Sequence, residues 1–338
     1  MRRLLEMTTD NGIMPSRATS GEQSGLRIHI SEESAFAGVR QQCPRCRANI
    51  DGLECQFCGV HMRVVRGIVY ALPPDRAAHY EHFIEDYERI RAAEGRGSQE
   101  DEFYLNLPFK DVSGANRHQW KIRARSFDYL MTQILKQNPR FGGGRVLDLG
   151  AGNCWMSYRL ALAHYRPFAV DLLTNDNDGL GAAEHFRNHL PTMFSRFQAE
   201  LARLPFQDDQ FDVAVFNASF HYAEDYVSAL REALRCVKRG GLVLVSDTPW
   251  YSREESGREM VQERRASFLQ RFGTSSDSIA SLEYLTDERL RALEEELSIR
   301  WTIHSPQYGV KWAMRPLVAR LRNRREPSRF RIYATRKP

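Results

Sequence analysis

The sequence predicts an α/β fold with a doubly wound, mostly parallel sheet, preceded by a small metal-binding module. Short apolar runs alternate with helix-forming stretches from Gly144 onward, as expected for strands that helices bury on both faces. A glycine-rich turn follows the first apolar run, and four cysteines upstream fall into two C-x-x-C pairs. A chain of 338 residues has room for one sizeable α/β domain and such a module.

Composition places the chain among globular proteins. Its 42% hydrophobic and 27% charged residues are ordinary values. No run reaches the roughly 18 apolar residues that a membrane-spanning helix needs. The first residues are basic but lack an apolar core, so no secretory signal is predicted. We therefore expect a cytoplasmic protein.

The formal net charge of +5 is concentrated at one end of the chain. Between Lys311 and Pro338 there are ten Lys or Arg and a single acid, Glu326. Such a cluster can meet phosphate, an acidic substrate or an anionic membrane surface, and it can equally be the solvated face of a helix. The sequence leaves these interpretations open.

The two C-x-x-C pairs predict a structural zinc site. Their residues are Cys43, Cys46, Cys55 and Cys58. Zinc takes four soft ligands in a tetrahedron, and each C-x-x-C turn presents two thiolates from one tight knuckle. A segment of about 30 residues cannot bury a stable core, so metal binding would supply its folding free energy. Four thiolates leave no open coordination position, so the expected role is structural and not catalytic.

The cysteine-containing segment resembles the zinc ribbons of small activator proteins of tRNA and protein methyltransferases. It also resembles the ribbon fused to bacterial ribosomal RNA guanine methyltransferases. The resemblance lies in the second knuckle and in the Gly-Ile and apolar stretch after it, here Gly67, Ile68, Val69 and Leu72. It covers residues 41–72 and indicates a ribbon more securely than it indicates a substrate.

We expect four segments along the chain. These are a flexible N-terminal segment (1–40), the zinc ribbon (41–72), a helical connector (73–116) and the α/β domain (117–338). The connector is predicted from an amphipathic pattern over residues 76–93, which turn-forming residues follow.

The α/β domain is predicted to contain seven strands and several helices. The strands are expected at 145–150, 167–172, 197–200, 211–218, 241–247, 299–304 and 330–336. The helices are expected at 117–136, 155–164, 179–190, 225–238 and 287–297. The last two strands, joined by a long insertion, would form an antiparallel pair at the edge of a seven-stranded sheet.

The glycine-rich turn is the first candidate for ligand binding. It reads Asp148-Leu-Gly150-Ala151-Gly152, and its glycines let the backbone approach a nucleotide-like ligand without a Cβ clash. About 20 residues further on, Asp171 ends the second strand, where a carboxylate can accept the ribose hydroxyls. G-x-G alone is a weak signal, because dinucleotide-binding enzymes share it.

These residues resemble motif I and its partner acid in class I S-adenosylmethionine (SAM)-dependent methyltransferases, whose sheet is Rossmann-like. The resemblance implies that Asp148 and the backbone of residues 150–152 hold the methionine part of SAM. It also implies that Asp171, followed by Leu172, holds the ribose. Cys154 stands where the family usually has a third glycine, which weakens a dinucleotide-binding interpretation more than a SAM-binding one.

The next segment is similar to the D-A-x-x-L-P-F stretch of methyltransferase type 11-like enzymes that act on small molecules, including quinone and sterol methyltransferases. It begins at Glu200, and the resemblance implies that this carboxylate accepts the adenine amino group while the N–H of Leu201 meets the adenine ring. The stretch from Asn217 to Tyr222 resembles the family's N-x-x-x-H-H sequence near the transferring methyl. Together the matches cover about residues 120–250.

We therefore predict that the protein is an enzyme, a SAM-dependent methyltransferase. SAM brings its own activated methyl, so the main task of the protein is to position the acceptor in line with it. His221 is the candidate general base, although a histidine at this place more often lines or packs the pocket.

The acceptor stays open at this point. The quinone- and sterol-type motifs favour a small or lipid-like molecule. The first alternative is an RNA or protein methyltransferase that docks through the ribbon and the basic C-terminal segment. The second is a SAM-binding partner protein without activity of its own. No transmembrane segment is expected, and the oligomeric state is not indicated.

Overall fold

Nine strands form a single sheet in the computed structural model, which describes residues 36–338; most of the segment 1–40 lies outside the described residues. Seven strands correspond to the predicted ones. They are β5 (Arg145–Leu149), β6 (Arg166–Asp171), β7 (Ser195–Gln198), β8 (Phe211–Asn217), β9 (Val237–Ser246), β10 (Thr302–His304) and β11 (Ile332–Arg336). The order across the sheet is β10-β11-β9-β8-β5-β6-β7-β4-β3.

The strand directions confirm the doubly wound arrangement. Strands β5 to β9 run parallel to one another. Strand β11 runs antiparallel to β9, and β10 runs antiparallel to β11, which confirms the predicted antiparallel edge pair. The carboxyl ends of the parallel strands therefore meet at one edge of the sheet, where ligands bind in folds of this kind.

Two further strands extend the sheet beyond the predicted seven. They are β3 (Arg63–Val65) and β4 (Ile68–Tyr70), which form a hairpin. Strand β4 pairs parallel with β7, so that Val69 lies opposite Phe197. The hairpin supplies hydrogen-bond partners to an edge that would otherwise be open. The apolar stretch that the sequence assigns to the ribbon thus belongs to the sheet as well.

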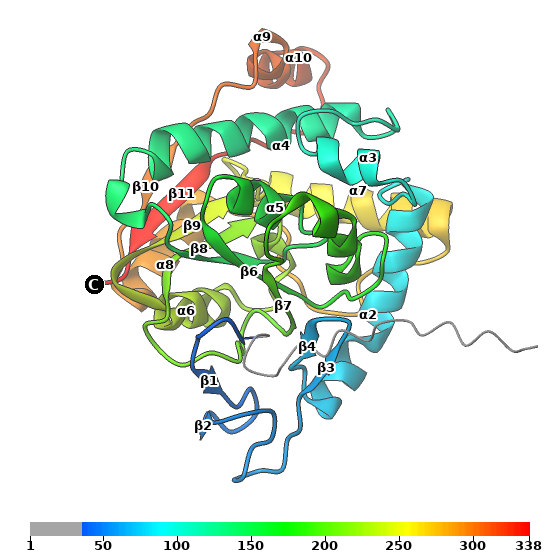
Figure 1. Ribbon diagram of the computed structural model, residues 1–338. Helices are drawn as coiled ribbons and strands as arrows, with labels where there is room; N and C mark the ends of the chain where they lie inside the picture. The colour runs from blue at the N-terminus through cyan, green and yellow to red at the C-terminus, as the bar shows by residue number, and fades with distance from the viewer. Residues whose placement is uncertain (1–35) are drawn as a thin grey trace, which may run out of the picture. The chain divides into compact units, whose positions relative to one another are not determined.

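Helices cover both faces of the sheet (Figure 1). One face carries α4 (Arg117–Tyr129), its π-helical continuation η1 (Leu130–Leu135), α5 (Trp155–Leu162) and the 3-10 helix η3 (Leu180–His189). The other face carries α6 (Tyr226–Cys236) and α8 (Asp287–Leu297). Within β5, Leu147 and Leu149 enter one core and Val146 enters the other, which is the two-sided burial that the apolar runs predict.

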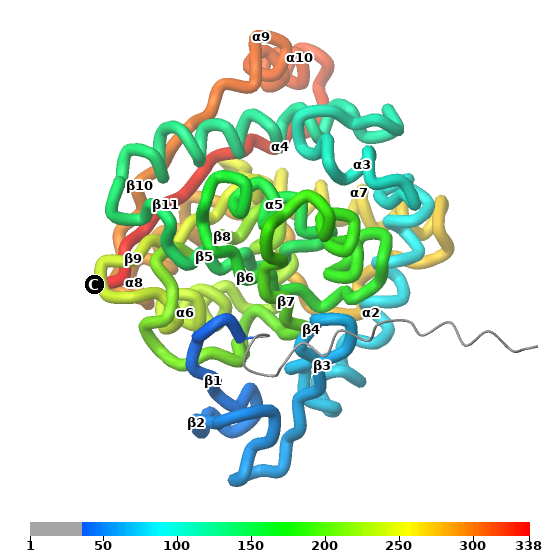
Figure 2. The backbone as a smooth tube through the Cα atoms, in the orientation of Figure 1, coloured from blue at the N-terminus to red at the C-terminus, as the bar shows by residue number. Residues whose placement is uncertain are grey.

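The remaining helices connect or flank these layers. They are α2 (Pro74–Ala93), α3 (Asp101–Asn106), η2 (Pro139–Phe141), η4 (Phe220–Tyr222), α7 (Glu254–Phe272), α9 (Val310–Ala313) and α10 (Arg315–Leu321). Of these, α3, η2 and η4 add buried residues to the core. Figure 2 follows the chain from the blue N-terminal module through β3 and β4 into α2, drawn in cyan. No helix of the described residues combines the length and apolar character needed to cross a membrane.

The cysteine module is a small two-stranded sheet, β1 (Gln41–Gln42) and β2 (Asn49–Ile50), with turns on either side. It contacts the larger domain directly. The N–H of Gln42 donates to the carbonyl of Pro205 at 3.1 Å, and the Arg47 guanidinium bonds the Glu232 carboxylate and the carbonyl of Ala202. The module is therefore held against the loop that precedes β8.

Candidate active site

A cavity lies at the carboxyl ends of β5, β6 and β8, and we call it the strand-end cavity. It brings together eight of the nine cofactor-binding residues that the sequence predicts. These are Asp148, Gly150, Ala151, Gly152, Asp171, Leu172, Leu201 and Asn217. The ninth, Glu200, does not line it. The location follows from the topology, because these residues all end or follow parallel strands.

The glycine turn after β5 requires glycine for two reasons. Gly150 has φ +76° and Gly152 has φ +53°, both in the left-handed region. A Cβ at Gly150 would lie 2.2 Å from the Cβ of Ser219, closer than two such carbons can approach. The N–H groups of Gly150 and Ala151 both donate to the carbonyl of Val170, at 2.8 and 3.0 Å, which fixes the turn against β6.

Asp171 is held by two backbone donors. Its carboxylate accepts from the N–H of Gly152 at 2.8 Å and from the N–H of Leu173 at 2.8 Å. Burial raises the pKa of Asp171 to about 6, against the opposing effect of these donors. Each carboxylate oxygen has a second lone pair, so the group can still accept hydrogen bonds from a ligand.

Asp148 lies deeper than Asp171. The side chain is buried and accepts a hydrogen bond from Ser157 Oγ at 2.7 Å. Burial raises its pKa to about 7, and the nearby Asp171 adds to the shift. A buried carboxyl of this kind favours a cationic group of a ligand, which would stabilise its charged form.

Cys154 takes the place of the family's usual third glycine and keeps the same backbone shape. It is the N-cap of α5, with φ +62° in the left-handed region, and its side chain is fully buried. A non-glycine residue at this angle is strained by about 1 kcal/mol. The buried side chain belongs to the hydrophobic core on this face of the sheet, which gives it a packing role.

The Glu200 carboxylate is bound by side chains of α2 and does not face the strand-end cavity. Arg76 of α2 donates from Nε to both carboxylate oxygens at 3.1 Å and from Nη2 at 2.8 Å, and Tyr80 donates at 3.1 Å. The Glu200 side chain is only 3% exposed. Sequence reasoning missed Arg76 as its partner, since 124 residues separate the two along the chain.

A second cavity, of about 280 Å³, adjoins the first. The two share six lining residues, which come from α2, α4 and the loop after β8. These are Phe83, Tyr87, Arg91, Arg123, Ala218 and Tyr222. From the sequence, the helix around residues 120–130, the insertion 250–272 and the segment 308–325 are candidate walls for an acceptor; the first two line this cavity, and the third does not. Sequence reasoning missed α2, whose amphipathic pattern was visible but whose place against the cavity was not.

His221 lies in the second cavity and not in the first. Its Nδ1 is buried and has no hydrogen-bond partner among the described residues. Burial lowers the pKa of His221 to about 3, and the neighbouring Arg264 and Arg123 lower it further in the same direction. The imidazole is therefore neutral at physiological pH and a weak base, which favours a packing or hydrogen-bonding role over general-base catalysis.

The charged side chains that line the second cavity differ in whether they have an ion-pair or hydrogen-bond partner. Arg264 pairs with Glu283. No ion pair or hydrogen bond joins the Arg123 guanidinium to any residue that the structure describes, and burial together with Arg91 and Arg96 lowers its pKa to about 10. Asp247 accepts a hydrogen bond from a serine with one oxygen, while its Oδ2 is buried and unpartnered within the described part of the chain. The cavity thus presents the Arg123 guanidinium, which lies 4.9 Å over the Trp120 ring, and Asp247 Oδ2, both without an ion pair or hydrogen bond among the described residues.

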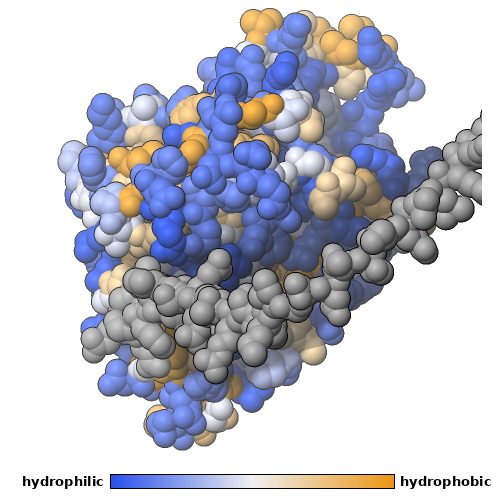
Figure 3. All heavy atoms as spheres, turned by 45° about the vertical axis from the view of Figure 1, so that its right-hand side comes forward, coloured by the Kyte–Doolittle hydropathy of each residue, from blue (hydrophilic) through white to orange (hydrophobic). Residues whose placement is uncertain are grey.

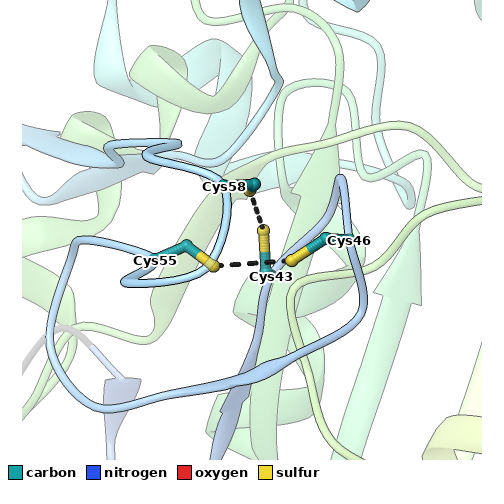
Figure 4. A group of neighbouring side chains, drawn as sticks. All are labelled: Cys43, Cys46, Cys55 and Cys58. Atoms are coloured by element: carbon teal, nitrogen blue, oxygen red, sulfur yellow. Dashed lines mark hydrogen bonds between the residues drawn. The ribbon is translucent and has the colours of Figure 1, made fainter.

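The four paired cysteines form a compact group (Figure 4). Their sulfur atoms all lie within 4.8 Å of one another, and the Cys43–Cys58 and Cys46–Cys55 pairs are 3.5 Å apart. Zinc–sulfur bonds of about 2.3 Å in a tetrahedron place neighbouring sulfurs about 3.8 Å apart, so the group fits a zinc ion.

Both knuckles close in the same way. The N–H of Arg47 donates to the carbonyl of Cys43 at 3.0 Å, and the N–H of Gly59 donates to that of Cys55 at 2.8 Å. Arg47 and Gly59 both have φ in the left-handed region. A glycine directly after the second cysteine pair is a sequence sign of such a turn, whereas nothing in the sequence indicates that Arg47 adopts the same conformation.

The strand order, the antiparallel edge pair and the strand-end cavity are those that the resemblance to class I SAM-dependent methyltransferases predicts. Residues 147–245 match a family model described as a methyltransferase domain. The matched residues run from β5 to the end of β9 and contain the motifs that line the strand-end cavity.

Two curated relatives match about 30% of the chain. A demethylmenaquinone methyltransferase from Mycobacterium marinum is 31% identical over 105 residues, which cover 31% of this chain and 42% of that protein. The uncharacterized methyltransferase YcgJ from Bacillus subtilis is 33% identical over 106 residues, covering 30% and 40%. The chain therefore spans about two fifths of the length of these relatives.

Solved structures of methyltransferases are more distant. A SAM-dependent methyltransferase from Mesorhizobium loti has a TM-score of 0.42 and 19% identity, covering 62% of this chain and 99% of that one. A complex of the Haloferax volcanii Trm112 methyltransferase activator with a methyltransferase gives a TM-score of 0.44 and 18% identity, covering 71% of this chain and 100% of that one.

Proposed function

We propose that the protein transfers a methyl group from SAM to a small acceptor bound in the second cavity. The single observation that carries the proposal is the wall shared by the two cavities, in which Ala218 and Tyr222 follow β8. A cofactor in the strand-end cavity and an acceptor in the second cavity would meet there. Methyl transfer needs such an end-to-end placement.

SAM supplies an activated methyl when it is bound, and the residues of this chain hold and orient it. Asp148 and the backbone of residues 150–152 would hold the methionine part, and Asp171 the ribose. The Leu201 N–H would meet the adenine ring, while Asn217 would lie near the methyl. Glu200 would accept the adenine amino group only if Arg76 shares or releases its carboxylate.

The second cavity supports a small acceptor over a macromolecule. Its volume is near the lower end of the range for small-molecule sites, and α2, α4 and α7 all contribute walls. Apolar side chains such as Phe83, Ile122 and Phe268 line it beside the Arg123 and Asp247 side chains. An acceptor with an apolar body and at least one polar group would satisfy both kinds of wall.

We further propose that the cysteine group binds a structural zinc ion. A tetrahedral zinc ion would be bound by all four sulfurs, so it would have no open coordination position for a catalytic ligand. The ribbon contributes no residue to either cavity.

The experiment is acceptor-dependent formation of S-adenosylhomocysteine by the purified chain. Panels of small amphipathic acceptors, RNA and protein are supplied with SAM, beside an Asp148→Asn variant. Turnover with small acceptors that the variant loses would support the proposal. Turnover only with RNA or protein would contradict a small acceptor and assign the enzyme to a macromolecular substrate. SAM binding without turnover on any panel would favour a non-catalytic partner.

A further inference from the structure

An exposed apolar stripe runs along the C-terminal helical segment. Helices α9 and α10 follow one another with Met314 between them in a right-handed helical conformation. The N–H of Met314 bonds the carbonyl of Val310 at 3.0 Å, and the N–H of Val318 bonds the carbonyl of Met314 at 3.1 Å, so Met314 is bonded to both helices, while Pro316 at the joint has no N–H to donate. We call residues 310–321 the C-terminal helix.

Five aliphatic side chains on this helix face solvent. They are Val310 (79% exposed), Met314 (44%), Leu317 (49%), Val318 (40%) and Leu321 (78%). Their spacing of i, i+4, i+7, i+8 and i+11 puts them within an arc of about 100° on one face of a helix about 18 Å long. Scattered exposed apolar residues are normal, but a stripe of five on one face indicates a surface that binds an apolar partner.

The opposite face attaches the helix to the rest of the domain. Trp312 stacks on Phe330 with ring centroids 5.5 Å apart, and the Arg315 guanidinium lies 3.5 Å over the Trp312 ring. The Trp312 ring also lies 6.0 Å from that of His118 on α4. The aromatic side of the helix therefore packs inward and the aliphatic stripe points outward. Figure 3 shows orange, hydrophobic side chains beside blue ones at the top, over the segment labelled α9 and α10 in Figure 1.

Basic side chains flank the stripe. Lys311, Arg320, Arg322 and Arg324 are exposed. None of the four makes a side-chain ion pair with the residues that the structure describes, whereas the following Arg325 pairs with Glu263 at 2.7 Å. On a helix, Lys311 and Arg322 fall on one side of the stripe and Arg320 on the other. Unpaired cations along both borders of an apolar face match a surface of anionic headgroups over acyl chains.

We propose that the C-terminal helix docks the protein on an anionic lipid surface, with the stripe at the acyl boundary and the cations on lipid phosphates. RNA fits less well, since single-stranded RNA is recognised by exposed aromatic rings and Trp312, the sole ring of the helix, packs inward. Phe330, on which Trp312 stacks, also lines the second cavity. Docking would therefore bring that cavity near the lipid. The proposal goes beyond methyl transfer and does not depend on it.

The test is co-sedimentation of the full chain with vesicles of phosphatidylcholine alone and of phosphatidylcholine mixed with phosphatidylglycerol. The wild type should bind the anionic vesicles and bind neutral ones at least tenfold more weakly, because each basic group near such a surface contributes about fivefold. A Leu317→Asp/Leu321→Asp variant should lose at least tenfold in binding. An Arg320→Glu/Arg322→Glu variant should lose the preference for anionic lipid.

Leu162→Asp serves as the matched control, since Leu162 is a 44% exposed leucine outside this helix, and it should bind like the wild type. Thermal unfolding checks that every variant is folded, and the charge-reversal variant tests the proposal separately should the leucine variant fail to fold. Equal binding of wild type and leucine variant, or no binding to anionic vesicles, overturns the proposal. Binding to RNA that survives the leucine substitutions and is lost on charge reversal would assign the helix to nucleic acid instead.

Discussion

The guanidinium of Arg76 on α2 holds the carboxylate of Glu200 through three contacts of 2.8 to 3.1 Å, and both residues lie beside the strand-end cavity without Glu200 lining it. Glu200 follows β7 and Arg76 lies in the first turn of α2, so this pair connects α2 to the sheet. Further along α2, Phe83, Tyr87 and Arg91 line both cavities. The ion pair therefore positions a helix that the cofactor and the acceptor would share.

Replacing Arg76 with alanine should destabilise the protein and weaken SAM binding together. The change removes the closest cation of the buried Glu200 carboxylate and leaves only Arg203, 3.5 Å away, which costs roughly 3 kcal/mol. Thermal unfolding and calorimetric titration of SAM measure the two effects. The double variant Arg76→Gln/Glu200→Gln removes the buried charge and should recover most of the stability. Unchanged stability in Arg76→Ala would contradict a structural role for the pair.

Gly150→Ala should destabilise the protein by about 2–4 kcal/mol, since the new methyl meets Ser219 and the backbone angle is left-handed. Gly273→Ala is the matched control. Gly273 has a similar φ of +74°, but nothing lies within 4 Å of a Cβ there, so it should cost only about 1 kcal/mol. Chemical denaturation measures both. Equal losses would show that the contact with Ser219 does not constrain the turn.

SAM affinity should fall as the pH drops through the range in which Asp148 and Asp171 take up protons. Burial raises the pKa of Asp148 to about 7 and that of Asp171 to about 6, and protonation removes the charge that a cationic ligand would meet. Calorimetric titrations between about pH 5 and pH 8 measure the trend. Asp148→Asn should bind more weakly and lose the upper part of the pH dependence. A flat profile in the wild type would contradict this assignment.

The same two groups should act on the stability of the ligand-free protein in the opposite sense. Their pKa values are higher in the folded chain than in the unfolded one, so the folded state binds more protons between about pH 4 and pH 7. Their contribution to the free energy of unfolding is present at low pH and is lost as the pH rises through the folded values. Comparing wild type with Asp148→Asn by denaturation at several pH values isolates the Asp148 part.

Removal of zinc should unfold the cysteine module around β1 and β2 and spare the SAM site. One zinc per chain is expected by elemental analysis, and Cys43→Ser or Cys55→Ser should reduce it, since either change leaves three thiolates. SAM affinity should stay within about twofold, because no ribbon residue lines the strand-end cavity. Cys236→Ser, at a buried cysteine outside the group, is the control and should keep its zinc. Full zinc content in both ribbon variants would contradict the four-thiolate site.

Local patterns predicted the parallel strands and the glycine turn, because β5 to β9 bury both faces and alternate with amphipathic helices. The β3–β4 hairpin was out of reach, since its pairing with β7 joins residues 68–70 to 196–198 and depends on an edge that the sequence does not show. The same reason hid the Arg76–Glu200 pair and the place of α2. Sequence motifs located the strand-end cavity, whereas the second cavity arises from helices that meet only in the folded chain.

The most direct test of the central claim is calorimetric titration of SAM and S-adenosylhomocysteine into the zinc-loaded chain, beside Asp171→Ala. The wild type is predicted to bind both ligands with micromolar affinity. The affinity of the variant should be at least tenfold lower, because Asp171 lies in the strand-end cavity between the Gly152 and Leu173 N–H groups. A folded wild type that binds neither ligand, or a variant that binds both as well as the wild type, would contradict the claim.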